Sequence, residues 1–383
     1  MAIDAALGRL GIKAGVCTSS TRPANPYEGQ MIYETDTDSL FVWSGSAWTE
    51  VGATDPGSEY TAIASGTTGE RPVSPTAGMI RFNETINEPE WYSPVAGWLK
   101  FRSGPVMDVA YLVVAGGGGG GATATATGSG GGGGAGGYRN SYALESSGGN
   151  TSTETVSTLT IGSNYTVSVG AGGTGATTGQ RTVAPSGSDS VFADITAVGG
   201  GGGGASQTTS GADGGSGGGG GYQMTGGTAT VAQGYNGGSG GNGSPYGGGG
   251  GGGAGGVGAS TNTSPAGGVG LASSITGVSV FRAGGGGGGC ENAAGGAGGN
   301  GGGANGAQNS TGSSAPVNLG GGGGGAGGVS ANAGGNGGSG VVILRYSSDR
   351  TINLGVGLTA TTSTVGAEKV TTITAGTGTV SWS

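Results

Sequence analysis

Runs of six or more consecutive glycines recur along this chain of 383 residues. They lie at Gly116 to Gly121, Gly199 to Gly204, Gly247 to Gly253, Gly284 to Gly289 and Gly320 to Gly325. Glycine loses more backbone freedom on ordering than any other residue, so such a run is either disordered or held where no side chain fits. The choice between these two states decides what the chain can fold into.

The chain contains 104 glycines without a strict Gly-X-Y period, a composition typical of disorder and not of collagen. Short segments of strand-like composition stand between the runs, however, and several lead directly into glycine, as in VVAGGGGGG and AVGGGGGG. They are Val109 to Ala115, Tyr165 to Val169, Val191 to Val198, Val278 to Phe281 and Val341 to Tyr346. Regular apolar segments imply a buried face, so the pattern favours order.

An ordered glycine run has one attractive conformation, the polyproline-II-like helix with three residues per turn and about 3.1 Å rise. This helix makes no internal hydrogen bonds, so its N–H and C=O groups must pair with neighbouring helices. Only glycine lets backbones approach closely on every side. The sequence therefore predicts an all-β protein whose glycine-rich part combines short strands with a packed layer of polyglycine II helices.

Connections between the runs carry tyrosines among Ser, Thr, Asn and Gln, which is typical of binding loops because the ring gives contact area at low entropy cost. The candidates for receptor contact are Tyr138, Tyr142, Tyr222, Tyr235 and Tyr246. The alternative interpretation is that these rings lie against the glycine layer as lids.

The first hundred residues contain two copies of one unit, at 22–51 and 71–101. Both read Arg-Pro, then Pro, then Gly, and this motif recurs at an offset of 49. Aromatic positions follow in both copies, such as Tyr33 with Phe82 and Trp48 with Trp98. Each unit is predicted to be a small β-meander, with strands at Gln30 to Tyr33 and Leu40 to Trp43 in the first copy.

A meander of about thirty residues is too small to bury two tryptophans alone, which predicts oligomerisation through this region, as a homotrimer. The alternative is a monomeric two-unit domain in which the copies bury each other. The candidates for the oligomer core are Tyr33, Trp43, Trp48, Phe82, Trp91 and Trp98.

The remaining segments complete a four-part organisation. Residues 1–20 are expected to anchor the chain in a larger assembly, because Met1 to Val16 fits a short docking helix. The same stretch is too short and too charged for a membrane span or a secretory signal. Residues 21–104 hold the two β-repeat units, 105–346 form the glycine-rich domain, and 347–383 form closing strands in which Trp382 packs.

Charge and catalytic residues are sparse. The net charge is −8, and no basic groove for nucleic acid is visible. The chain has no histidine and no lysine in P-loop spacing, so we expect no enzyme activity, metal or cofactor. Cys17 and Cys290 have no CxxC partner and are expected to be packed thiols. Nine charged residues lie between 116 and 340: Arg139, Glu145, Glu154, Arg181, Asp189, Asp194, Asp213, Arg282 and Glu291.

The strings VAYLVVAGGGGGG, NYTVSVGAGGTG, SDSVFADITAVGGGGGG and GGNGGSGVVILRY resemble the glycine-rich domain of bacteriophage tail fibres and related virion proteins. The twin RPxxPxxG units resemble short β-repeats of cyanophage and other phage fibres. The resemblance implies a virion surface protein, anchored to other virion proteins by 1–20, with a shaft or collar at 21–104. It further implies a polyglycine II sandwich whose loops contact the host.

Three functions stay open on the residues. Binding to a host saccharide or outer-membrane protein suits neutral loops that carry tyrosine. A head fibre or capsid decoration would use the same fold with inert loops. An extracellular glycine-rich protein of a cell is expected to carry a secretion signal, which is not visible.

Overall fold

The computed structural model describes residues 15–37, 39–51, 63–95, 97–100, 106–124 and 128–383. The chain forms two compact units, Met1–Val106 and Met107–Ser383. Both are all-β, as the sequence predicts. The helix expected over 1–16 lies outside the described residues except for Gly15 and Val16, which belong to a strand.

The first unit contains two four-stranded sheets of the same topology. One has the order β1 (Gly15–Cys17), β2 (Met31–Glu34), β3 (Ser39–Trp43), β4 (Trp48–Glu50). The other has the order β5 (Ser65–Gly66), β6 (Ile80–Asn83), β7 (Glu88–Ser93), β8 (Gly97–Lys100), with a short 3₁₀ helix η1 (Thr68–Glu70) after β5. In each sheet a short parallel first strand extends the predicted antiparallel meander.

The repeated arginine of each unit forms an ion pair with a buried glutamate. Arg22 pairs with Glu34 on β2, whereas Arg71 pairs with Glu90 on β7, at 2.5 Å between Nη2 and Oε2. Glu34 and Glu90 are both almost completely buried. The arginine of the Arg-Pro motif therefore meets a buried glutamate in both sheets, but the glutamate comes from the second strand of one sheet and the third strand of the other.

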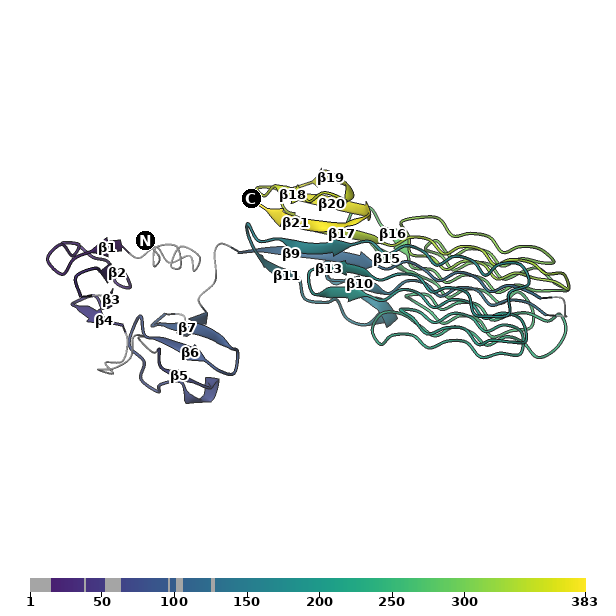
Figure 1. The fold of residues 1–383 in the computed structure, drawn as a ribbon, viewed down its shortest axis with the longest axis horizontal. Coiled ribbons are helices and arrows are strands. Elements are labelled where there is room, and N and C mark those ends of the chain that lie inside the picture. Colours follow the sequence, from purple (N-terminus) through teal and green to yellow (C-terminus); the bar gives the residue numbers. More distant parts are fainter. Residues whose placement is uncertain (1–14, 38, 52–62, 96, 101–105, 125–127) are drawn as a thin grey trace. The chain divides into compact units, whose positions relative to one another are not determined.

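The second unit is built on two facing sheets (Figure 1). The first has the order β10 (Tyr138–Asn140), β9 (Val106–Val114), β17 (Val341–Ser347), β20 (Glu368–Ala375), β19 (Thr359–Val365), and β11 (Ser157–Thr160) also pairs with β9. The second has the order β14 (Ile195–Ala197), β13 (Ser190–Phe192), β12 (Tyr165–Ser168), β21 (Thr377–Trp382), β18 (Ile352–Leu354). A hairpin of β15 (Leu271–Ser273) and β16 (Val280–Arg282) and a 3₁₀ turn η2 (Gly148–Asn150) complete the strand end.

Side chains from both sheets form one core. Alternate residues of β9 and β17, such as Tyr111 and Leu344, pack against Phe192 of β13 and Trp382 of β21. The opposite faces of β9 and β17 are covered by a second cluster that includes Tyr138 and Ile275. The predicted burial of Trp382 is confirmed, and the strands of 347–383 pair with β12 and β17 of the glycine-rich part.

One glycine run stands at the centre of the rest of the unit. The N–H groups of residues 130–135 donate to three different neighbouring runs, and each neighbour is met again three residues later. Gly131 and Gly134, for example, donate to Gly204 and Gly201. The carbonyl groups of the same six residues accept from three further runs, and all twelve N–O distances lie between 2.7 and 3.0 Å. This period of three is that of polyglycine II.

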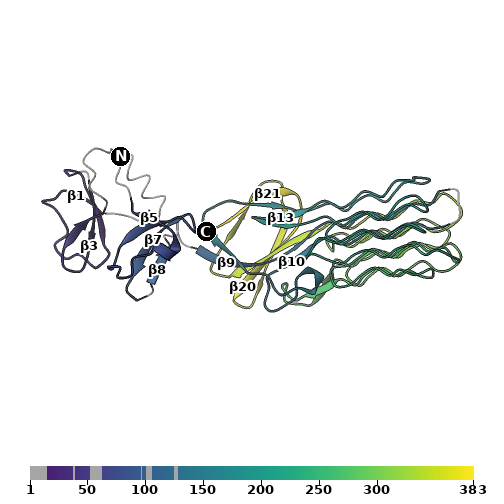
Figure 2. The same ribbon diagram turned by 90° about the horizontal axis from the view of Figure 1, so that it is seen from below.

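Six runs surround the central one, and each hydrogen-bonds to the next to close a ring. In order around the ring they are 116–121, 199–204, 215–221, 248–253, 284–289 and 321–326. All are buried, and Figures 1 and 2 show these segments lying side by side and extending away from the strands. The glycine runs thus form a hexagonal bundle, not the layer or sandwich expected from the sequence.

A second shell of sparser sequence surrounds the ring. Its residues follow a Gly-Gly-X pattern in which X faces outward: Ala294, Ala297 and Asn300 are exposed, whereas Gly296 and Gly299 are buried. Much of 209–213, 226–241, 257–270 and 295–316, interpreted as loops from the sequence, belongs to this shell. The predicted strand Val191 to Val198 is likewise a hairpin, because Ala193 adopts φ +53° between β13 and β14.

Alanine at the centre of the bundle is expected to destabilise the fold severely. A Cβ at Gly133 would lie closer than 3.0 Å to the carbonyl oxygen of Gly118, which belongs to the backbone of a fixed neighbour. We expect Gly133→Ala to cost at least about 3 kcal/mol of unfolding free energy, measured by denaturant titration. Ala297→Ser, which adds an atom at an exposed outer position, is expected to change stability by less than about 0.5 kcal/mol. Equal stability of the two variants would contradict the bundle.

Candidate functional site

The loops of the bundle gather at the end opposite the strands. Run 116–121 leaves β9 and run 130–135 returns to β10, so residues 122–124 and 128–129 between them lie at the far end. Hydrogen-bond registers give the same placement for eight further connections. We call the nine segments the distal loops: 122–129, of which 125–127 lie outside the described residues, 177–183, 205–208, 222–225, 242–246, 260–264, 290–294, 308–311 and 328–332.

The distal loops are polar but nearly uncharged. They consist mainly of Ser, Thr, Asn, Gln and Gly, and their only charged residues are Arg181 and Glu291. Arg181 is exposed, whereas Glu291 is buried and accepts a hydrogen bond from the Gly128 N–H at 2.7 Å. The exposed surface at this end therefore offers amide and hydroxyl groups, which can donate and accept hydrogen bonds without a charge.

Two of the five tyrosines predicted as contact residues belong to the distal loops. The rings of Tyr222 and Tyr246 meet edge to face with centroids 5.4 Å apart. Tyr222 is only 4% exposed, so its prediction as a contact residue is wrong and the lid interpretation describes it. Tyr246 is half-buried beside it.

The other three tyrosines lie at the strand end. Tyr138 is completely buried on β10, which excludes surface contact and corrects its prediction. Tyr142 stacks under the Arg345 guanidinium, with the ring centroid 4.8 Å from Cζ. The Tyr235 hydroxyl donates to the Gly149 carbonyl at 3.2 Å and accepts from Asn150. The predicted set therefore does not form one surface.

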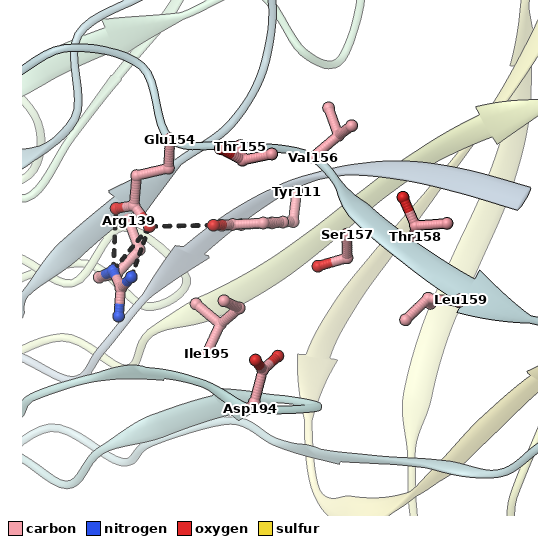
Figure 3. A pocket seen from close by; sticks show the side chains of 10 residues that line it. All are labelled: Tyr111, Arg139, Glu154, Thr155, Val156, Ser157, Thr158, Leu159, Asp194 and Ile195. Carbon is pink, nitrogen blue, oxygen red and sulfur yellow. Dashed lines mark hydrogen bonds and ion pairs between the residues drawn. The ribbon is translucent and has the colours of Figure 1, made fainter. Parts of the chain in front are cut away.

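A pocket of about 410 Å³ opens at the strand end, where sequence reasoning proposed no site. Figure 3 shows its lining side chains, which come from β9, β10, the segment before and within β11, and the β13–β14 turn. They are Tyr111, Arg139, Glu154, Thr155, Val156, Ser157, Thr158, Leu159, Asp194 and Ile195. The sequence feature that could have indicated this pocket is the presence of three charged residues, at 139, 154 and 194, in a segment with few charged residues.

Glu154 organises the polar side of this pocket. Its carboxylate accepts hydrogen bonds from the Arg139 guanidinium, from the Ser147 hydroxyl at 2.7 Å and from the Tyr111 hydroxyl at 2.9 Å. Burial alone would raise the pKa of Glu154, but these hydrogen bonds outweigh burial and hold its pKa below the ordinary value. Burial, with the Glu154 charge, raises the pKa of Tyr111. The group therefore acts as a fixed structural brace between β9, β10 and the chain before β11.

The aromatic residues predicted for an oligomer core lie partly exposed on the two small sheets. Trp43 and Trp48 face each other across β3 and β4 with ring centroids 5.4 Å apart, and Tyr92 and Trp98 do so across β7 and β8 at 5.5 Å. Tyr33, Phe82 and Trp91 are also half-buried. A role in oligomerisation remains a prediction for these residues.

Within the described ranges, no group of three or more His, Cys, Asp or Glu is placed to hold a metal ion. Neither is any helix of those ranges long and apolar enough to cross a membrane. Both cysteines are free; Cys290 is buried with its Sγ 3.3 Å from the Pro245 carbonyl oxygen, as expected of a packed thiol, whereas Cys17 is half-exposed.

The fold and loops define a strand-anchored glycine bundle. Residues 99–347 match the family described as Glycine-rich domain, and the chain belongs to this family. No curated protein and no solved structure matches the chain.

Glu154→Gln is expected to remove a pH-dependent part of the stability. Because the folded pKa of Glu154 is lowered, its contribution is present above the unfolded value of about 4.3 and is lost as the pH falls through the folded value. We expect wild type to exceed the variant by about 1.5–3 kcal/mol at pH 7, and the gap to shrink below about pH 4. Denaturant titrations at pH 7, 5 and 3.5 measure this gap. A pH-independent gap would contradict the role given to this carboxylate.

Proposed function

We propose that this protein is a bacteriophage virion fibre that contacts the host cell surface with the distal loops of its glycine-rich unit. The observation that carries the proposal is the gathering of nine loops at one end of a bundle whose interior is almost entirely glycine. A rigid scaffold that presents variable loops at one end is a common design for binding proteins. The resemblance of the glycine segments to those of phage fibres supports the same function.

The composition of the distal loops favours a neutral, hydroxyl-rich ligand. Amide and hydroxyl side chains match the donors and acceptors of a saccharide, and the edge of Tyr246 can contribute an apolar contact. We therefore propose a host surface saccharide as the ligand class, with an outer-membrane protein as the alternative. In this proposal the N-terminal residues attach the fibre to other virion proteins.

The first test is inhibition of phage adsorption by the purified full-length protein. We expect wild type to block adsorption to host cells, and Tyr246→Ala combined with Asn292→Ala to need at least about tenfold more protein for the same block. Tyr235→Ala is the matched control, because this ring lies at the strand end. Digestion of the host surface polysaccharide is expected to abolish cell binding if the ligand is a saccharide.

Failure of a well-folded protein to bind host cells would contradict the proposal. That result would favour the structural alternative, a head fibre or capsid decoration with inert loops. Equal loss of blocking in the distal and strand-end variants would mean that the contact lies elsewhere on the molecule.

The half-exposed aromatic pairs of the first unit support a homotrimer. Their rings would be covered by the same surfaces of two further copies, which removes apolar area from water. Light scattering of the full chain is expected to give three times the chain mass. Trp43→Ser with Trp98→Ser is expected to lower it, and a monomeric wild type would contradict the trimer.

A further inference from the structure

Among the residues that the structure describes, the second shell of the glycine bundle leaves one position unfilled. Five of the six ring runs have a segment lying directly outside them. Each such segment makes backbone hydrogen bonds to one ring run and to no other ring run. These corner segments are 172–176, 226–229, 256–259, 295–299 and 310–313. The sixth ring run, 199–204, has none among the described residues. We call the position outside it the open corner.

Every third N–H of the run at the open corner points away from its neighbours. Gly200 and Gly203 donate to Gly116 and Gly119, and Gly201 and Gly204 donate to Ser216 and Gly219. The remaining N–H groups, those of Gly199, Gly202 and Ala205, have no backbone acceptor in the described part of the chain. A period of three places them in one line along the open corner.

Side-chain oxygens accept from these three groups. Asp189 Oδ1 accepts from Gly199 at 2.8 Å, Ser186 Oγ from Gly202 at 3.3 Å, and Thr209 Oγ1 from Ala205 at 2.8 Å. All three residues belong to the segments that flank the open corner. Asp189 and Ser186 are exposed, so both residues lie at the surface of the molecule.

Other corners show what these side chains replace. Gly250 and Gly253 donate to the backbone carbonyls of Ala259 and Gly256, and Gly324 donates to that of Ser313. A further glycine-rich segment in the polyglycine II conformation would direct every third carbonyl group toward the run. These carbonyls could accept from the same three N–H groups at the open corner. An unpaired line of N–H groups is a template for strand addition, as at the edge of a β-sheet.

We propose that Ser186, Asp189 and Thr209 close the open corner against an outer glycine-rich segment of a second copy of this chain. The second-shell segments of the bundle, such as 333–340 (AGGNGGSG), have the composition that fits this position. Lateral addition would require displacing three hydrogen bonds and burying the Asp189 carboxylate, which is costly without a partner charge. This inference does not depend on host binding.

Hydrogen exchange at single amides tests the closure. In the full-length variant Ser186→Ala/Asp189→Ala, we expect the Gly199 and Gly202 amides to exchange about tenfold faster than in wild type, measured by NMR. The Gly200 and Gly203 amides, bonded to the neighbouring run, are expected to keep their wild-type rates and report an intact bundle. Ser188→Ala is the matched control, since this exposed serine lies in the same segment. Unchanged rates at Gly199 and Gly202 would overturn the proposal.

Association tests the occupant. We expect the double variant to form larger assemblies than wild type in sedimentation velocity at equal concentration, and to bind a synthetic AGGNGGSG peptide with shifts at the Gly199 and Gly202 amides. Asp189→Asn retains an acceptor oxygen and is expected to behave as wild type. If the double variant shows faster amide exchange but neither associates nor binds the peptide, the closing role is overturned. Association of the single variant Asp189→Asn would overturn it as well. If the double variant unfolds, Ser186→Ala alone must still show faster exchange at Gly202 and peptide binding there.

Discussion

The lateral hydrogen bond between neighbouring glycine runs is the interaction on which this protein depends. Each run makes no backbone hydrogen bonds within itself, so its stabilisation comes from the neighbouring segments that accept and donate in turn, six of them around the central run. At the glycines of the ring a neighbouring backbone atom, in most cases a carbonyl oxygen, lies where a Cβ would stand, so glycine is a steric requirement at those positions. Strands β9 and β10 fix where run 116–121 begins and where the central run 130–135 ends, and the loop between them follows from that placement.

Sequence reasoning reached the conformation of the runs but not their arrangement. The length of the runs and the strand-to-glycine junctions were enough to predict ordered polyglycine II. The second shell was missed because its signal, a Gly-Gly-X period with X exposed, is weaker than a pure run and resembles a flexible loop. The start of ring run 215–221 was assigned to a loop for a similar reason, because Ser216 interrupts its glycines.

The candidate sites show the limit of arguments from loop composition. Tyrosine in a polar connection indicated recognition, yet Tyr138 belongs to a strand and Tyr222 lies beneath its loop, as burial alone reveals. The pocket beside Glu154 joins residues from distant parts of the chain, and the pairing of Arg139 with Glu154 depends on the positions of β9 and β10. No spacing rule in a single sequence fixes that pairing.

The period of three also limits how such a chain can change. Inserting one residue into a run would turn every following N–H by about 120° and direct it to the wrong neighbour, whereas inserting three would leave all directions as they were. Runs are therefore expected to lengthen or shorten in whole turns, extending the bundle along its axis. The distal loops carry no such restriction, so new surface can be added at that end without altering a single interior bond.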